Sequence, residues 1–136
     1  MIEKREKVYQ AFATFLADFV RDLNDSSVDG WSVLVEGLRD ERALIKLGYE
    51  GNLLTVAELG RSSIVAGLAG AKKVIILTDL DGEGATLASR FVRRLNHEGV
   101  QVSLSERRRL KAASRGVFLH IENLARFAGT EADLWG

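Results

Sequence analysis

The stretch KKVIILTDLDGEG, residues 72–84, places a short apolar run directly before an acidic turn. The run is continuous rather than alternating and is rich in β-branched residues, which is typical of a strand buried on both faces of a parallel sheet. Three carboxylates, Asp79, Asp81 and Glu83, follow within five residues. Because like charges this close repel one another, the turn is either a cation site or a solvated turn that is acidic without a ligand.

On both sides of this stretch, short apolar runs alternate with stretches of helical periodicity. Strands are expected within WSVLVEG (31–37), GNLLTVAELG (51–60), KKVIILTD (72–79) and VQVSL (100–104). Helices are expected within RDERALIKLG (39–48), RSSIVAGLAGA (61–71), GATLASRFVRRLNHEG (84–99), SERRRLKAAS (105–114) and HIENLARFAG (120–129). This alternation predicts an α/β fold, with a mainly parallel sheet of about four strands and helices on both of its faces.

A further helix is expected ahead of the sheet, over residues 3–24. Its apolar side chains recur every three or four residues and form one stripe, which we expect to pack on the sheet. The stripe consists of Val8, Phe12, Phe15, Leu16, Phe19 and Leu23. The turn formers of NDSSVDG, residues 24–30, are expected to end this helix. No repeat or linker divides the chain, which predicts one domain over 1–136: a helix over 1–26, an α/β core over about 31–110 and a C-terminal helical segment over 111–136.

Composition excludes several classes of site. The chain has no cysteine, which removes disulfides, thiolate metal ligands and cysteine nucleophiles. No apolar stretch approaches the ~20 residues that span a bilayer, so we expect a cytoplasmic protein that does not enter a membrane. The formal net charge is zero, but residues 90–115 hold eight Lys or Arg and only two Glu. This basic segment is expected to bind polyanions locally.

Two of the predicted strands end in a carboxylate. Glu36 follows the strand in WSVLVEG, and Asp79 follows the strand in KKVIILTD, 43 residues later. In open parallel sheets ligands bind beyond the carboxyl ends of the strands. If the two strands are neighbours, Glu36, Asp79, Asp81 and Glu83 therefore face one crevice. Carboxylate oxygens suit Mg²⁺ or Mn²⁺, which would also offset their mutual repulsion.

At these residues the sequence resembles the Toprim domain, which is shared by topoisomerases, bacterial-type primases and several nucleases. VLVEGLRDERAL resembles the first motif of the family, with Glu36 and Gly37 as its glutamate–glycine pair. VIILTDLDGEG resembles the second motif, with Asp79 and Asp81 as its Asp-x-Asp pair and Glu83 as the third acid of topoisomerase-type members. The likeness covers about residues 31–110, and small stand-alone Toprim proteins of archaea are similar in length and wording. The resemblance implies a Rossmann-like Toprim fold.

The resemblance also implies roles for these residues. Glu36 would act as a general acid/base or a metal ligand, and Asp79 and Asp81 would take part in catalysis by holding one or two Mg²⁺ ions, for which Mn²⁺ can substitute. Glu83 would be an outer or additional ligand. Leu38 departs from the pattern, because many family members carry a basic residue after the glycine.

The basic segment supplies the candidates for contacts with DNA or RNA. Arg107, Arg108 and Arg109 are the first candidates for binding phosphates, and Arg93 and Arg94 are the second. The alternative is that these arginines only line the solvated faces of two helices, and the segment lacks the interleaved aromatic residues that stack on bases. The two histidines, His97 and His120, are expected to be structural.

These features favour a small Mg²⁺-dependent nuclease or phosphotransferase, acting alone or with a protein partner. Neither tyrosine, Tyr9 or Tyr49, has the context of a topoisomerase nucleophile, and a chain without cysteine cannot supply the zinc module of a primase. Two other interpretations fit the same residues. One is a non-catalytic module that binds or assembles within a DNA-repair or RNA-processing complex. The other is a phosphatase of the haloacid-dehalogenase type with Asp79 as nucleophile, although Glu83 replaces the threonine of that motif.

Overall fold

The fold alternates strands and helices behind one long N-terminal helix. The computed structural model describes residues 2–61 and 71–129 of the chain. Its elements are α1 (Ile2–Val28), β1 (Trp31–Val35), α2 (Leu38–Lys46), β2 (Leu53–Thr55), α3 (Val56–Arg61), β3 (Lys73–Ile76), α5 (Gly82–His97), β4 (Gln101–Ser103), α6 (Ser105–Ser114) and the 3₁₀ helix η1 (Ile121–Phe127). Among the described residues, no helix combines the length and the apolar character that a membrane span requires.

The four described strands form one parallel sheet in the order β2-β1-β3-β4. Leu34 of β1 pairs with Leu54 on one side and with Ile76 on the other, so β1 is an interior strand. The predicted α/β fold, with a parallel sheet between helices, is confirmed. The chain leaves β1 for β2 on one side and then crosses back to β3 on the other. The boundary between β1 and β3 is therefore the topological switch point, where ligands bind in open α/β sheets.

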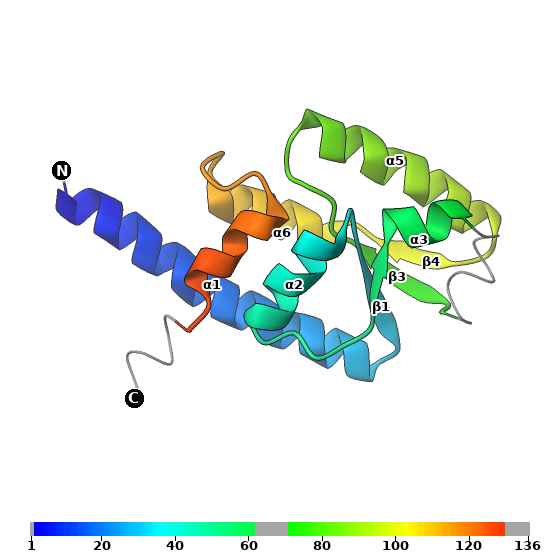
Figure 1. Ribbon diagram of the computed structural model, residues 1–136, viewed down its shortest axis with the longest axis horizontal. Helices are drawn as coiled ribbons and strands as arrows, with labels where there is room; N and C mark the ends of the chain where they lie inside the picture. Colours follow the sequence, from blue (N-terminus) through cyan, green and yellow to red (C-terminus); the bar gives the residue numbers. More distant parts are fainter. Residues whose placement is uncertain (1, 62–70, 130–136) are drawn as a thin grey trace.

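Helices cover both faces of the sheet, and successive strand residues alternate between them (Figure 1). On one face Val33, Val35 and Ile75 pack with apolar side chains of α1, α2, α6 and η1. On the other face Leu34 and Val74 pack with side chains of α3 and α5. Burial on both faces explains why these strands are continuous apolar runs.

Helices α2 and α5 each end at a glycine, as the sequence predicts. Gly48 follows α2 with φ 103°, and Gly99 follows α5 with φ 80°, in the left-handed region that favours glycine. The N–H of Tyr49 donates to the carbonyl of Leu44 at 2.9 Å, and the N–H of Val100 donates to the carbonyl of Leu95 at 2.9 Å. Both ends thus have the Schellman pattern, which satisfies carbonyls that the helix leaves unpaired.

The N-terminal helix differs from its prediction at both ends. It continues to Val28, because the side chain of Asn24 bonds the carbonyl of Gly48 at 3.0 Å and the N–H of Glu50 at 2.8 Å instead of closing a local turn. Most of the predicted stripe is buried, but the prediction is wrong at Val8, which is 41% exposed. Figure 1 shows that the N-terminal part of α1 extends beyond the sheet.

The stretch 51–60 is only partly a strand, since β2 ends at Thr55 and α3 begins at Val56. The hydroxyl of Thr55 accepts a hydrogen bond from the N–H of Glu58 at 3.2 Å, which caps the start of α3. The spacing Thr-x-x-Glu is a helix-start signal that competes with the apolar pattern. The helix predicted within 61–71 lies almost wholly outside the described residues, as does the end of the predicted C-terminal segment, residues 130–136.

Candidate metal centre

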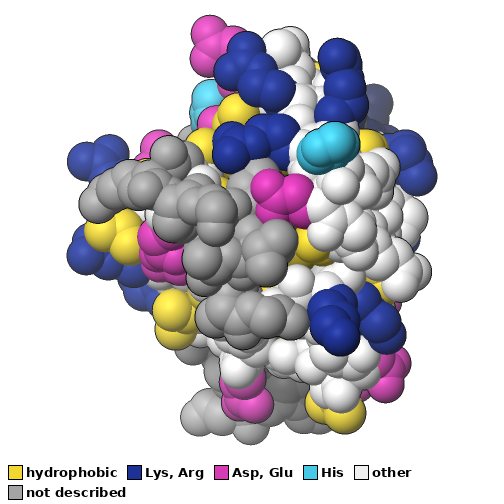
Figure 2. Space-filling model, turned by 90° about the vertical axis from the view of Figure 1, so that its right-hand side faces the viewer, with side chains coloured by type: hydrophobic (Ala, Val, Ile, Leu, Met, Phe, Trp, Pro, Cys, Tyr) yellow, Lys and Arg dark blue, Asp and Glu magenta, His cyan; other side chains and the backbone are white. Residues whose placement is uncertain are grey.

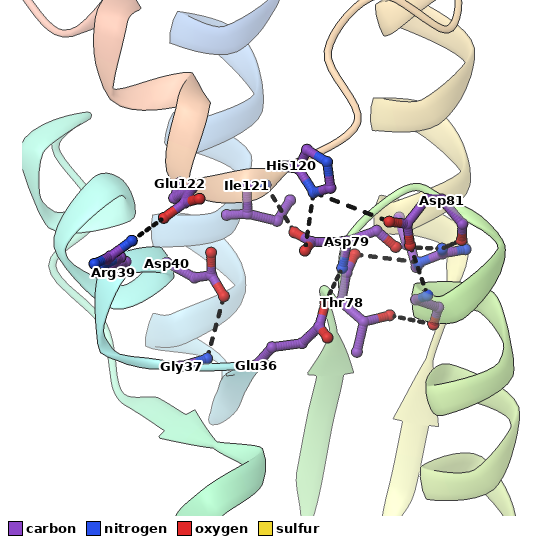
Figure 3. Close-up of polar contacts among 12 residues, drawn as sticks. Glu36, Gly37, Arg39, Asp40, Thr78, Asp79, Asp81, His120, Ile121 and Glu122 are labelled. Carbon is purple, nitrogen blue, oxygen red and sulfur yellow. Dashed lines mark hydrogen bonds and ion pairs between the residues drawn. The ribbon is translucent and has the colours of Figure 1, made fainter.

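The ends of β1 and β3 bring together the two acidic positions that the sequence places 43 residues apart. The carboxylate of Glu36 accepts a hydrogen bond from the backbone N–H of Asp79 at 2.8 Å (Figure 3). This contact crosses the switch point between the two neighbouring strands. The Glu36 carboxylate thus contacts the backbone of the Asp-x-Asp sequence.

The acidic turn, residues 78–84, is built largely from its own contacts. Asp81 is the N-cap of α5, and its Oδ1 accepts a hydrogen bond from the N–H of Gly84 at 2.8 Å. The hydroxyl of Thr78 donates to the carbonyl of Gly84 at 2.7 Å. A Cβ on Gly84 would lie 1.8 Å from the carbonyl oxygen of Asp79, whereas a Cβ at Gly82 meets nothing within 4 Å. Only a glycine at position 84 therefore lets the turn close.

Arg107 of α6 contacts the backbone of this turn. Its side chain is 7% exposed, and its guanidinium donates to the carbonyls of Asp79 at 2.6 Å and Thr78 at 3.3 Å. Burial lowers the pKa of Arg107, and the negative charges of Asp81 and Glu36 oppose that shift. The buried guanidinium thus places a positive charge behind the carboxylates and fixes the backbone that carries them. Arg107 is therefore buried against the acidic turn, and the surface contact with phosphates that the sequence predicted for it does not fit this position.

The C-terminal segment, residues 117–127, lies against the other side of the acidic turn. The N–H of Leu80 donates to the carbonyl of Leu119 at 2.7 Å, and the N–H of Ile121 donates to Oδ1 of Asp79 at 2.9 Å. Between these two anchors, Nδ1 of His120 lies 3.3 Å from Oδ2 of Asp79 and 3.9 Å from Oδ2 of Asp81 (Figure 3). His120 thus lies in the candidate site, which the sequence did not indicate, since it favoured a structural role for this residue.

Among the described residues, Asp79, Asp81 and His120 form the one group of three whose ligand atoms all lie within 4.8 Å of one another. Glu36, a predicted ligand, lies outside this group, and its carboxylate bonds the backbone N–H of Asp79. Glu83, the fourth predicted ligand, is an exposed residue in the first turn of α5 and lies outside the group. There its negative charge stabilises the helix N-terminus.

Burial and crowding act on the acidic groups around the turn. Burial raises the pKa of Glu36, and the charge of Asp79 raises it further against the opposing effect of the Asp79 N–H. Burial also raises the pKa of Asp40, whose carboxylate accepts from the N–H of Gly37 at 3.1 Å and is repelled by Asp79. The hydrogen bond with Asp79 raises the pKa of His120. Each shift favours the protonated state of the group, in which the region around the turn carries less net negative charge.

The donors present fit a divalent cation. Two carboxylates and one imidazole converge, and oxygen or nitrogen donors of this kind bind Mg²⁺, Mn²⁺ and related ions. Two of the carboxylate oxygens, Oδ1 of Asp79 and Oδ1 of Asp81, accept backbone N–H groups. Such contacts fix the orientation of a carboxylate before any ion arrives.

The remaining basic candidates are spread over two helices. Arg108 and Arg109 are exposed on α6, where Arg109 also pairs with Asp22 at 3.1 Å. Arg93 and Arg94 are exposed near the end of α5, about 16 Å along the helix from its start at the acidic turn. On the face shown in Figure 2, basic side chains occur in separate groups with acidic ones among them. The five predicted arginines therefore do not form a single surface.

The missed residues differ in the signal that the sequence carries for them. Asp40 stands three residues after Gly37, and its carboxylate closes the start of α2, a spacing that a search for capping residues would find. His120 has no local signal, because only the packing of the C-terminal segment brings it to the turn. Arg107 is predicted as a phosphate contact rather than missed, but the run of three arginines gives no indication of which one is buried.

Comparison with known proteins places the chain among archaeal relatives. It is 32% identical over 124 residues to a UPF0292 protein of Pyrococcus abyssi, covering 91% of this chain and 86% of that protein. It is 30% identical over 108 residues to the UPF0292 protein of Archaeoglobus fulgidus, covering 79% and 85% of the two chains. The solved structure of a protein from Aquifex aeolicus superposes with a TM-score of 0.66 at 29% identity, covering 78% of this chain and 94% of that one. No family model matches the chain. By its identity to these relatives over most of its length, the chain belongs to the UPF0292 family.

Proposed function

We propose that this protein binds a divalent cation and acts on phosphodiester bonds of DNA or RNA, alone or with a protein partner. Mg²⁺ is the ion that the resemblance to Toprim domains implies. The observation that carries the proposal is the contact between the Glu36 carboxylate and the N–H of Asp79 at the switch point of the sheet. It sets the acid of the first Toprim-like motif against the Asp-x-Asp pair of the second.

The two aspartates and Glu36 have different tasks in this proposal. Asp79 and Asp81 hold the cation through the oxygens that their backbone contacts leave available. When bound, the cation stabilises the negative charge that develops on phosphate oxygens. Glu36 moves a proton to or from the attacking or leaving oxygen. Its raised pKa supports this task, because a carboxyl that ionises closer to neutral pH is a better proton donor and acceptor.

Arg108 and Arg109 are the basic residues that we assign to the nucleic-acid backbone. Both are exposed on α6, the helix whose Arg107 bonds the acidic turn, and Arg109 also contacts Asp22 of α1. Arg93 and Arg94 lie about 16 Å from that turn along α5, a distance of about five base steps of a duplex. They would thus contact a strand only beyond the reacting bond.

A non-catalytic cation-binding module is the second candidate function. The observation in its favour is that each carboxylate oxygen of Asp79 already has a partner in the C-terminal segment, namely Ile121 or His120. Such a site can hold an ion as part of a fixed surface, on which DNA, RNA or a partner protein assembles without reaction.

Titration calorimetry with Mg²⁺ and with Mn²⁺ tests the cation site. We expect wild type to bind and Asp79→Asn to lose binding, because Asp79 takes part in the convergent group. Glu83→Gln is the matched control, since it removes one carboxylate of the same turn outside that group. Equal binding by wild type and Asp79→Asn would remove the metal assignment.

Incubation with labelled DNA and RNA tests the reaction. Single-stranded, duplex and hairpin substrates are supplied with Mn²⁺ or Mg²⁺, beside Glu36→Gln. We expect cation-dependent products from wild type and a loss of about a hundredfold or more in Glu36→Gln. Cation binding without any product from these substrates would favour the non-catalytic module.

A further inference from the structure

His120 lies where a third ligand of the cation would lie. It is the N-cap of η1 and comes from a part of the chain about forty residues beyond the acidic turn. In Figure 3 its ring stands over the gap between Asp79 and Asp81, and dashed lines join it to both. The ring is 49% exposed, so solvent and ions reach it.

Each aspartate has one carboxylate oxygen held by a backbone N–H and the other directed toward this ring. Oδ1 of Asp79 is held by the N–H of Ile121, and Oδ1 of Asp81 is held by the N–H of Gly84. Oδ2 of each aspartate then faces Nδ1 of His120, at 3.3 and 3.9 Å. Adjacent ligands of one ion lie about 3.0 Å apart in an octahedral site and about 3.4 Å apart in a tetrahedral site. The two separations from Nδ1 are therefore close to those between ligands of one ion, with a small inward movement for the longer one, and the ligand atoms of the three residues all lie within 4.8 Å of one another.

The backbone on each side of His120 is tied to the acidic turn. Leu119 accepts from the N–H of Leu80 at 2.7 Å, and Ile121 donates to Asp79 at 2.9 Å. Side chains of Phe118 and Phe127 pack with Phe12 of α1 on either side of these contacts. A ligand needs this kind of support, because the position of a loosely held imidazole is not defined.

From this geometry we infer that His120 is a nitrogen ligand of the cation and sets its identity. The inference rests on the proposed function, because it concerns the same cation held by Asp79 and Asp81. Mg²⁺ prefers a complete shell of oxygen ligands, whereas an imidazole nitrogen favours first-row transition ions. The site should therefore bind Mn²⁺ more tightly than Mg²⁺, and the preference should depend on His120.

Pulsed electron paramagnetic resonance with bound Mn²⁺ tests the bond directly, because the spin echo of Mn²⁺ is modulated by a coordinated nitrogen. The chain has two histidines, so the signal has two possible sources once any affinity tag is removed. We expect the imidazole modulation in wild type and in His97→Asn, and its loss in His120→Asn. His97 is the matched control because it lies at the other end of α5.

Competitive titration of the same variants measures the selectivity. We expect His120→Asn to lower the affinity for Mn²⁺ by about tenfold or more and to change the affinity for Mg²⁺ much less. Binding of Mn²⁺ that requires Asp79 but shows no nitrogen modulation in wild type would overturn the inference and leave the proposed cation site standing. Absence of any binding by wild type would overturn both.

Discussion

The acidic turn and the C-terminal segment meet at the same site but are held by different kinds of contact. Within the acidic turn, the bonds of Thr78 and Asp81 to Gly84 span six and three residues. The C-terminal segment reaches the turn from about forty residues away, through Leu119 and Ile121. The first kind of contact leaves a motif in the sequence, and the second leaves none. The following variants test the local contacts and the long-range contacts separately.

Filling the space at Gly84 should have the largest effect, because it breaks the acidic turn itself. In Gly84→Val the Cβ would meet the carbonyl of Asp79 at 1.8 Å, and backbone must move. We expect a loss of about 3 kcal/mol or more in the free energy of unfolding, measured by urea denaturation, and loss of Mn²⁺ binding. Gly82→Ala is the control, since its Cβ meets nothing within 4 Å and its cost should stay within about 0.5 kcal/mol. Similar costs for both would show that the turn tolerates a side chain at position 84.

Truncating Phe127 should loosen the C-terminal segment while leaving the acidic turn intact. Phe127 is 4% exposed, and its ring centroid lies 4.4 Å from that of Tyr9 and 5.1 Å from that of Phe12. We expect Phe127→Ala to cost about 3 kcal/mol.

Hydrogen exchange by NMR reports the local consequence of Phe127→Ala. The amide of Ile121, which bonds Asp79, should exchange faster relative to that of Gly84, which bonds Asp81. Val117→Ala is the control, because Val117 is 62% exposed in the same segment. Equal acceleration at both amides would mean that the segment and the turn open together.

Replacing Arg107 should have a smaller effect and show how far the acidic turn depends on distant contacts. Arg107→Gln loses the charged bonds to the carbonyls of Thr78 and Asp79. We expect a cost of about 2 kcal/mol in the free energy of unfolding and weaker Mn²⁺ binding. The adjacent, exposed Arg108 gives the control, and Arg108→Gln should stay within about 0.5 kcal/mol. If the two variants were equally stable, the turn would be self-supporting.

The smallest expected effect is a change in pH dependence at Asp40. Burial first, and repulsion from Asp79 second, raise the pKa of Asp40 above its ordinary 3.8. A raised carboxyl pKa means that ionisation costs more in the folded state. This group therefore lowers stability as the pH rises from 3.8 through the raised pKa, and the loss persists at higher pH.

Asp40→Asn removes this ionisation while keeping an oxygen that can accept the N–H of Gly37. In metal-free buffer we expect the variant to become more stable relative to wild type as the pH rises across that window. Chemical denaturation at several pH values measures the difference. A constant difference, or one that falls with pH, contradicts the assignment. Saturating Mn²⁺ should reduce the trend, because it offsets the charge of Asp79.

Much of the fold could be predicted because its signals are local. Continuous apolar runs such as Val33–Val35 indicated strands buried on both faces, and Gly48 and Gly99 indicated helix ends. Two errors came from local signals that tertiary contacts overrode. Asn24 is a turn former that instead stays helical and bonds Gly48 and Glu50, and Val8 follows the helical stripe but is 41% exposed.

For the site, the sequence alone determined that Glu36, Asp79 and Asp81 follow strands and that a cation would suit them, because these features depend on neighbouring residues. Tertiary structure alone decided which strands are adjacent, which arginine is buried and which histidine joins the aspartates. Those outcomes depend on packing between elements far apart in the chain. Arg107 and Arg108 are identical and adjacent in sequence, yet only Arg107 faces the acidic turn, because the helix turns its neighbour toward solvent.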